Sequence, residues 1–395
     1  MNPAARTQAA IDLLDEIIAA AHGGGAAADT LIARYFSTRR YAGSKDRRAV
    51  RELVYTATRA AGDVPASGRA ALVALARQNA ELAATFDGST YGPAPIDPAE
   101  EAASGGFAPG WLIDALSVSG IDADELPALV ERAPLDVRVN RLKATRDSAV
   151  ASLAGAEALA RAPDALRLPA GTLVDQLPLY RDGVIEVQDA GSQVVGLALD
   201  ERPGQHIVDL CAGAGGKTLA IAAAMDNRGA VLACDTDRAR LSRLAPRAER
   251  AGVTIATTQL LDPSRETAAL EEWQGRADAV LVDAPCSGTG TWRRNPEARW
   301  RLTNDRLERL CATQRHVLDV AAGLVRPGGT LIYIVCSLLD AEGADQAQAF
   351  VLRHHGWQVD PISLPAGRAH RGGVRLTPAH DGTDGFFVAR LRAPC

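Results

Sequence analysis

The second half of the chain alternates short apolar runs with longer amphipathic stretches. From about residue 203 onward, apolar runs occupy 206–210, 230–234, 254–258, 279–282, 330–335 and 385–391. The stretches 238–251 and 304–325 lie between them, and the second repeats apolar residues at helical spacing at Leu307, Leu310, Val317, Leu318, Ala321 and Leu324. Strands that alternate with helices predict a doubly wound, Rossmann-like α/β sheet.

The first part of the chain has a helical pattern instead. Apolar residues recur at helical spacing over 9–21, 26–36, 46–61 and 70–84, with breaks at 23–25, 43–44 and Pro65, which predicts an all-α domain. Residues 87–109 are rich in Gly, Pro and Ser and predict a linker or long loop. After a further helical region that ends near residue 133, polar and apolar residues alternate over 137–142 and a helix is expected at 148–153. This indicates a small α/β element before the large sheet.

Composition narrows the class of protein. Hydrophobic residues make up 47% of the 395 and charged residues 23%, which is typical of a folded chain. The N-terminal stretch is amphipathic rather than a signal peptide, and no 18-residue apolar window predicts a membrane span. Six cysteines without a Cys-x-x-Cys pair argue against a zinc site or any other metal, and free thiols fit a reducing cytoplasm.

The formal net charge of −5 means that any polyanion must bind at a local basic surface. Residues 34–59 contain eight basic and two acidic residues, interleaved with Tyr35, Phe36, Tyr41 and Tyr55. A solvated helical face would account for this pattern. A surface that contacts phosphates and offers aromatic platforms to RNA bases would account for it equally well.

A glycine turn follows the first predicted strand of the large sheet, in Val208-Asp209-Leu210-Cys211-Ala212-Gly213-Ala214-Gly215-Gly216-Lys217-Thr218. A phosphate-binding loop would need glycine where Cys211 stands, and a dinucleotide fingerprint would need it at Thr218. The turn at a helix N-terminus still lets a ligand approach bare backbone, as in the class I methyltransferases that bind S-adenosylmethionine. Acids end the next three strands, namely Asp235, Asp262 and Asp283. A single one could be a helix cap, but three in succession favour ligand contacts.

Two cysteines also follow strands, Cys286 in Asp283-Ala284-Pro285-Cys286-Ser287-Gly288 and Cys336 in Val335-Cys336-Ser337. Buried cysteine is common as a small hydrophobe, and we apply that interpretation to Cys211, Cys234 and Cys311. Cytosine C5 becomes nucleophilic when a thiolate adds to C6, and the thiol must later be expelled as the C5 proton leaves. This chemistry needs a nucleophilic cysteine, an acid on the ring edge and a group that assists elimination. Cys336, Cys286 and Asp283 supply these catalytic parts.

At these residues the chain resembles the bacterial 16S rRNA cytosine-C5 methyltransferases of the RsmB type, within the RNA cytosine-5 methyltransferase superfamily. The likeness includes Arg138-Val139-Asn140-Arg141-Leu142-Lys143, the glycine turn, the Asp-Ala-Pro-Cys run, Arg293-Arg294-Asn295-Pro296 and His380-Asp381-Gly382-Thr383-Asp384-Gly385. It implies that Cys336 is the nucleophile and that Cys286 assists product release. It also implies S-adenosylmethionine contacts by Cys211, Ala212, Gly213, Ala214, Gly215, Gly216, Lys217, Asp235, Asp262 and Asp283.

The resemblance implies a NusB-like RNA-binding domain at 1–130, an RRM-like α/β element at 131–195 and a class I methyltransferase domain at 196–395. It favours RNA contact over a solvated face at the basic stretch. The residues expected to contact RNA are Arg39, Arg40, Lys45, Arg47, Arg48, Arg138, Asn140, Lys143, Arg293 and Arg294. We expect a cytoplasmic monomer that methylates 16S rRNA, free or early in small-subunit assembly. Trp292 and Trp300 stay unassigned between RNA contact and core packing.

The chain departs from the family pattern at two points, and other functions compete with this hypothesis. Gly213-Ala214 replaces the usual Ala-Pro, which predicts a less stiff turn, and Val335 replaces the usual Thr. The alternatives are a tRNA cytosine-C5 methyltransferase and a non-catalytic ribosome-assembly factor. Intact Cys286, Cys336 and Asp283 disfavour the second. A DNA cytosine methyltransferase would need only the Pro-Cys thiol, so the second cysteine argues against that enzyme.

Overall fold

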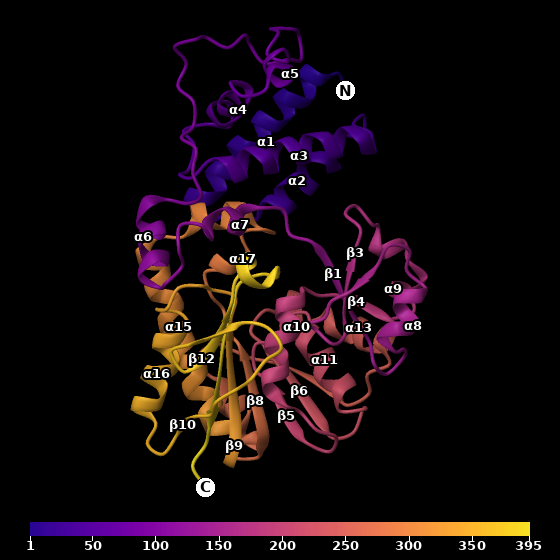
Figure 1. Cartoon of the computed structure of the whole chain (residues 1–395), viewed down its shortest axis with the longest axis vertical. Coiled ribbons are helices and arrows are strands. Elements are labelled where there is room, and N and C mark those ends of the chain that lie inside the picture. Colours follow the sequence, from indigo (N-terminus) through magenta and orange to yellow (C-terminus); the bar gives the residue numbers. More distant parts are fainter. The chain divides into compact units, whose positions relative to one another are not determined.

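The computed structural model describes residues 1–395, which divide into two units (Figure 1). The first unit comprises 1–132 together with 291–303, and the second comprises 133–290 and 304–395. The short segment 291–303 therefore belongs to the helical unit although its flanking residues belong to the other. None of the helices combines the length and apolar content that a bilayer span requires.

The first unit is all-α, as the apolar pattern predicts, which is consistent with a NusB-like domain. Its helices are α1 (Pro3–Gly23), α2 (Ala28–Ser37), α3 (Ser44–Ala60), α4 (Gly68–Ala76), α5 (Ala80–Ala83), α6 (Gly110–Val118), α7 (Leu126–Val130) and the 3-10 helix η5 (Pro296–Arg301). Helix α1 begins earlier than expected, because Asn2 accepts a hydrogen bond from Ala5 N at 2.7 Å and Pro3 fits the first turn. The stretch 70–84 is broken before Asn79, which caps α5.

The second unit begins with a small antiparallel sheet. Its elements are β1 (Leu135–Val139), α8 (Arg146–Ala151), β2 (Glu157–Ala158), β3 (Ala165–Leu168), η1 (Val174–Gln176), α9 (Pro178–Arg181) and β4 (Ile185–Val187). The strand order is β2-β3-β1-β4. This is the β-α-β-β-α-β succession of ferredoxin-like folds.

The large sheet of the second unit has nine strands, in the order β11-β12-β13-β9-β8-β5-β6-β7 with β10 beside β13. The strands are β5 (His206–Asp209), β6 (Ala230–Asp235), β7 (Ala256–Leu260), β8 (Ala277–Asp283), β9 (Val325–Val335), β10 (Gln358–Val359), β11 (Arg368–His370), β12 (Gly373–Leu376) and β13 (Phe386–Arg392). Strands β5 to β9 are parallel, and β13 pairs antiparallel with β9. The chain order reverses between β5 and β8, which is where open α/β sheets bind ligands.

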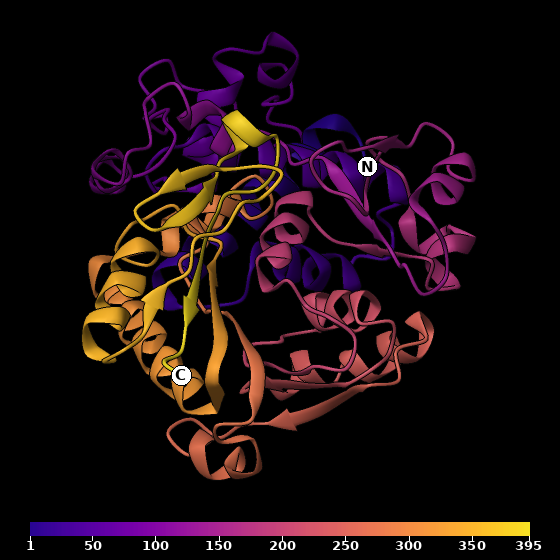
Figure 2. The ribbon, with the colours of Figure 1, turned by 60° about the horizontal axis from the view of Figure 1, so that its bottom comes forward.

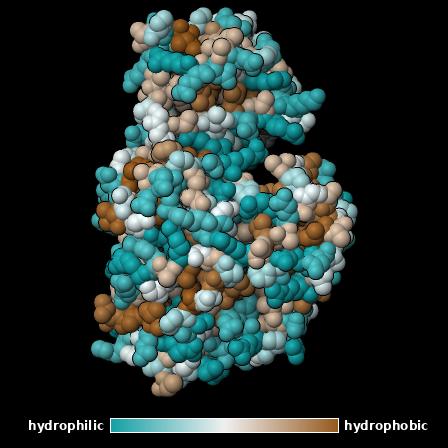
Figure 3. Space-filling view, in the orientation of Figure 1, coloured by the Kyte–Doolittle hydropathy of each residue, from teal (hydrophilic) through white to brown (hydrophobic).

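Helices cover both faces of this sheet (Figures 1 and 2). They are α10 (Ala190–Gly196), η2 (Leu197–Leu199), α11 (Gly216–Ala224), α12 (Arg238–Leu241), α13 (Leu244–Ala251), α14 (Glu266–Ala269), η3 (Glu271–Trp273), α15 (Asn304–Leu324), α16 (Ala344–Arg353) and α17 (Pro378–Asp381), with η4 (Thr289–Thr291) after β8. Successive strand residues point to opposite faces. Val208 therefore packs in one core with Leu318 of α15, and Ile207 packs in the other with Ile221 of α11. Hydrophilic residues predominate on the visible face of each unit (Figure 3).

Candidate active site

The strand-end residues of the second unit meet around one cleft. Loops that follow β5, β6, β8 and β9 border it, because the carboxyl ends of parallel strands meet at one edge of the sheet. The cleft has a volume of about 920 Å³, within the range of about 300–1,000 Å³ for small-molecule sites. Its lining includes Cys211, Asp235, Thr236, Arg240, Asp283, Pro285, Cys286, His316 and Cys336.

The two strand-end cysteines lie side by side in this cleft. The Sγ atoms of Cys286 and Cys336 are 3.3 Å apart. Strands β8 and β9 are adjacent and in register at Asp283 and Ile334, so the loops that follow them start next to each other. The hydrogen bond to Cys336, together with burial, raises the pKa of Cys286 well above its usual value. Either sulfur of the pair can donate to the other across this contact.

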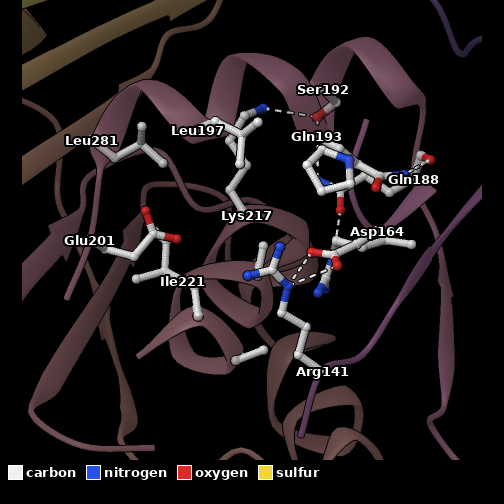
Figure 4. Close-up of a pocket in the computed structure, with 16 residues that line it drawn as sticks. Arg141, Asp164, Gln188, Ser192, Gln193, Leu197, Glu201, Lys217, Ile221 and Leu281 are labelled. Atoms are coloured by element: carbon white, nitrogen blue, oxygen red, sulfur yellow. Dashed lines mark hydrogen bonds and ion pairs between the residues drawn. The ribbon is translucent and has the colours of Figure 1, made fainter. Parts of the chain in front are cut away.

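Asp283, at the end of β8, is held by a buried lysine. Lys217 Nζ lies 2.7 Å from Asp283 Oδ2 and donates to Ser192 Oγ at 3.2 Å. The lysine side chain is 9% exposed and the Asp283 side chain 34%, so the carboxylate reaches the cleft and the ammonium lies behind it. Lys217 and Ser192 also border a small cavity of about 60 Å³, in which Figure 4 shows Lys217 directed toward Ser192 of α10. At the cleft the pair therefore presents the Asp283 carboxylate, a hydrogen-bond acceptor.

The glycine turn between β5 and α11 brings bare backbone to the cleft. Gly213 and Gly215 have φ of +56° and +84°, where side chains are rare. A Cβ on Gly213 would lie 2.4 Å from Nη2 of Arg240, and one on Gly215 would lie 2.1 Å from Cδ1 of Leu244. Asp235 accepts hydrogen bonds from Gly213 N and from Asp237 N, both at 2.7 Å. Its carboxylate therefore ties the turn to the end of β6, and glycine suits position 213 where the family pattern has Ala.

Other residues expected at the cofactor site differ in their placement. Cys211 lines the cleft, and burial raises the pKa of its thiol well above the usual value. Asp262 has an exposed side chain just after β7 and is not among the lining residues. Asp209 is fully buried at the end of β5 and accepts from Thr218 Oγ1 at 2.6 Å. Burial raises the pKa of Asp209 to about 7.

Sequence reasoning missed Glu342, which is completely buried next to the two cysteine loops. Ser287 and Ser337 both donate to its carboxylate. Ser192, the second partner of Lys217, stands in the run Gln188-Asp189-Ala190-Gly191-Ser192 that belongs to the family resemblance, but its role was not predicted from the sequence. The Ser287–Glu342 and Ser192–Lys217 contacts join residues far apart in the chain, and the local pattern around Glu342 does not distinguish it from Asp340 or Asp345.

The basic residues predicted to contact RNA in the helical unit are largely exposed. Arg40, Lys45, Arg47 and Arg48 lie on the surface around the start of α3. Arg39 is half-buried and lies over the Tyr35 ring, 3.5 Å from its centroid. The expectation of several aromatic platforms is wrong for Tyr35 and Phe36, because they are buried in the helical core. Tyr41, which is 72% exposed, can offer its ring.

In the small α/β element, two of the residues predicted to contact RNA are buried. Arg138 is 5% exposed, and its Nε donates to Gln188 Oε1 at 2.7 Å. Asn140 is 2% exposed, and its Nδ2 donates to the carbonyls of Gly183 and Ala251. These side chains bind the protein itself, which corrects the expectation of direct RNA contact. Lys143 has an exposed side chain, but its Nζ donates to the Asp182 and Arg250 carbonyls.

The segment 291–303 is part of the helical unit, and several of its side chains are buried. Arg293 is 8% exposed and Trp292 and Trp300 are buried, so the two tryptophans are core residues. The expectation of RNA contact by Arg293 is corrected in the same way, because a buried guanidinium presents no surface to a phosphate. Arg294 is half-buried.

Comparisons with known proteins agree with this geometry. A family model described as 16S rRNA methyltransferase RsmB/F matches residues 196–392. The probable ribosomal RNA small subunit methyltransferase B of Synechocystis sp. is 35% identical over 297 residues, 72% of this chain and 66% of that protein. The ribosomal RNA small subunit methyltransferase B of Pectobacterium carotovorum is 37% identical over 267 residues, 66% of this chain and 60% of that protein. The chain thus spans about two thirds or less of the length of these relatives.

A solved structure is similar as well. The crystal structure of a methyltransferase homolog protein from Pyrococcus horikoshii has a TM-score of 0.60 and 26% identity, and the match covers 72% of this chain and 99% of that one. It shares the Rossmann-like methyltransferase fold.

Proposed function

Because this chain belongs to the family described as 16S rRNA methyltransferase RsmB/F, we propose that it methylates C5 of a cytosine in 16S rRNA. The methyl donor in this proposal is S-adenosyl-L-methionine. The observation that carries the proposal is the pair of thiols, 3.3 Å apart, at the end of β8 and β9 beside the Asp283–Lys217 ion pair. Metal-free cytosine-C5 methylation needs these groups in one place.

The cleft fits the methyl donor. At position 213 the Arg240 guanidinium lies where a Cβ would stand, so a side chain there would have to displace a cation that lines the cleft. Asp235 uses each carboxylate oxygen once for a backbone N–H, and a carboxylate has about four acceptor positions. It can therefore also accept from a ribose hydroxyl. When bound, the donor supplies an electrophilic methyl group on a sulfonium.

The protein's own groups account for the steps on the base. Asp283 can accept from the exocyclic amino group of cytosine, and Lys217 holds that carboxylate in place. Cys336 loses its proton to solvent in the cleft and adds as a thiolate to C6. The electrons move toward N3 and O2, and the nearby lysine ammonium stabilises the charge that develops there. C5 then takes the methyl group, and the bonding electrons of the broken sulfur–carbon bond stay on the donor sulfur, which becomes a thioether. Loss of the C5 proton to solvent in the cleft restores the C5–C6 double bond as the C6–S bond breaks, and the Cys286 thiol hydrogen-bonds to the departing sulfur.

The substrate assignment rests on the family and on the exposed basic surface of α2 and α3. Arg40, Lys45, Arg47 and Arg48 can neutralise phosphates without specifying sequence. In this proposal the protein acts in the cytoplasm as a monomer, on rRNA that is free or early in small-subunit assembly. Its six cysteines are free thiols, as a reducing compartment allows.

The test uses Cys286→Ala, Cys336→Ala and the double variant with S-adenosyl-L-methionine and unmodified 16S rRNA. A slowly migrating protein–RNA adduct on a denaturing gel, formed by Cys286→Ala and lost in the double variant, is the expected result. An adduct formed by Cys336→Ala instead would exchange the two roles. No methylation by the wild type and no adduct from any variant would refute the proposed reaction on this RNA, and unmodified tRNA would then be tried.

A further inference from the structure

A buried carboxylate joins the two loops that carry the thiols. Glu342 follows β9 and has 0% of its surface exposed. Oε1 accepts from Ser287 N at 2.8 Å and from Gln314 Nε2 at 3.0 Å. Oε2 accepts from Ser337 Oγ at 2.6 Å and from Ser287 Oγ. Both oxygens are thus satisfied, and every donor is neutral.

The partners of Glu342 are the immediate neighbours of the two cysteines. Ser287 follows Cys286, and Ser337 follows Cys336. A buried hydroxyl adds a second link, since Thr289 Oγ1 lies 3.0 Å from Ser337 Oγ and accepts from Leu338 N at 2.8 Å. One carboxylate therefore fixes the separation of two loops that start on different strands.

Gln314 of α15 extends this network to the residue before Cys286. Its Nε2 donates to the Pro285 carbonyl at 2.9 Å as well as to Glu342. The Cys286 loop is thus held on both sides of its thiol. Hydrogen bonds to a buried carboxylate are stronger than those between neutral groups, so the loops resist separation.

We propose that Glu342 is a positioning residue that holds Cys286 within hydrogen-bonding distance of Cys336. The inference rests on the proposed function, in which attack requires the Cys336 thiol but release requires both thiols. Loosening the carboxylate link therefore slows release more than attack. A Glu342→Gln variant should therefore accumulate the protein–RNA adduct as Cys286→Ala does, although neither cysteine is changed.

The first experiment measures thiol spacing without RNA or methyl donor. Dibromobimane alkylates one thiol with loss of bromide and bridges to a second thiol nearby with loss of another. The ratio of bridged to singly labelled Cys286–Cys336 peptide, read by mass spectrometry, reports the spacing and not the reactivity of the first thiol. We expect Glu342→Gln to lower this ratio at least fivefold. Asp345→Asn is the matched control, because Asp345 lies close to Glu342 in the chain, in the first turn of α16, but pairs with Arg371.

The second experiment is the denaturing gel with S-adenosyl-L-methionine and 16S rRNA. Glu342→Gln should accumulate a Cys336-dependent adduct, whereas Asp345→Asn should release product like wild type. If Glu342→Gln does not fold, Ser337→Ala removes one hydroxyl partner, keeps the charge and should shift both readouts in the same direction. A bridging ratio and adduct fraction equal to wild type in a folded Glu342 variant, or in Ser337→Ala if that variant takes its place, would overturn the proposal. A lowered bridging ratio with no adduct even from Cys286→Ala would support the positioning role and refute the reaction instead.

Discussion

Arg299 offers a direct test of how the helical unit is held together. Its side chain is fully buried, and its guanidinium donates to the carbonyls of Thr58 at 2.5 Å, Arg59 at 3.2 Å and Ala61 at 2.9 Å. These carbonyls lie at the end of α3, where helical C=O groups have no partner within the helix. The charge is taken out of water to make this cap, and this burial lowers the pKa of Arg299 to about 10.

The variant Arg299→Met keeps the length of the side chain and removes every donor. Each hydrogen bond from a charged group contributes about 1.5–3 kcal/mol, and losing the donor leaves its carbonyl buried and unpaired. Removing the charge returns part of its desolvation cost. The net loss of stability of the helical unit is roughly 3–5 kcal/mol. Arg299→Lys keeps the charge but not the planar fork, so we expect an intermediate loss.

Hydrogen–deuterium exchange of peptides from the end of α3 measures this loss locally. A loss of that size raises the opening equilibrium at least about a hundredfold, since about 1.4 kcal/mol is a factor of ten. The control is Arg34→Met, because the Arg34 side chain is 68% exposed and its ion pair with Glu16 is 3.8 Å long. We expect that variant to stay within about 0.5 kcal/mol of wild type. A loss below about 1 kcal/mol in Arg299→Met would show that the carbonyls find other donors.

Three further predictions concern the second unit. Lys217→Met should slow single-turnover methyl transfer about a hundredfold, because it removes the donor beside Asp283, and rapid quench with a radiolabelled methyl donor measures it. Burial raises the pKa of Asp209 to about 7, above an unfolded value of about 4, so its ionisation opposes folding and stability falls as pH rises from about 4 through 7. Asp209→Asn should therefore reduce the difference in urea midpoint between pH 5 and pH 8, and an unchanged difference would contradict the reasoning. Gly215→Ala should weaken S-adenosyl-L-methionine binding at least about tenfold in calorimetry, because φ is +84° and the new Cβ would meet Leu244.

The convergence of Asp283, Cys286 and Cys336 was predictable from the sequence. Each follows an apolar run, and parallel strands bring their carboxyl ends to one edge. The glycine turn and Asp235 were predictable for the same reason, and the structure joins them through a hydrogen bond from Gly213 N. Residues whose partners are set by strand order alone are thus accessible to pattern analysis.

Residues whose roles depend on partners far away in the chain could not be predicted from the sequence. Arg293 and Trp292 appear in the sequence as part of a basic, aromatic loop, the usual composition of an RNA contact. Their burial arises because the segment packs against helices more than two hundred residues earlier. Arg138 was misassigned for a similar reason. Its guanidinium donates to Gln188, which comes 50 residues later in the chain. Local charge does not distinguish a buried polar network from an exposed one.

The helical unit is completed by a segment that the ribosome makes late. Residues 133–290 are synthesised between its two pieces, which takes roughly 10–30 s at about 5–20 residues per second. During that interval the helical core lacks Trp300, and the carbonyls at the end of α3 lack Arg299. During this interval the N-terminal helices therefore expose apolar surface that the finished core buries, and chaperones bind such surfaces. Neither 1–132 nor 133–395 is a complete unit for expression alone, because the first lacks Trp300 and the second carries residues 291–303 without the helices of their own unit.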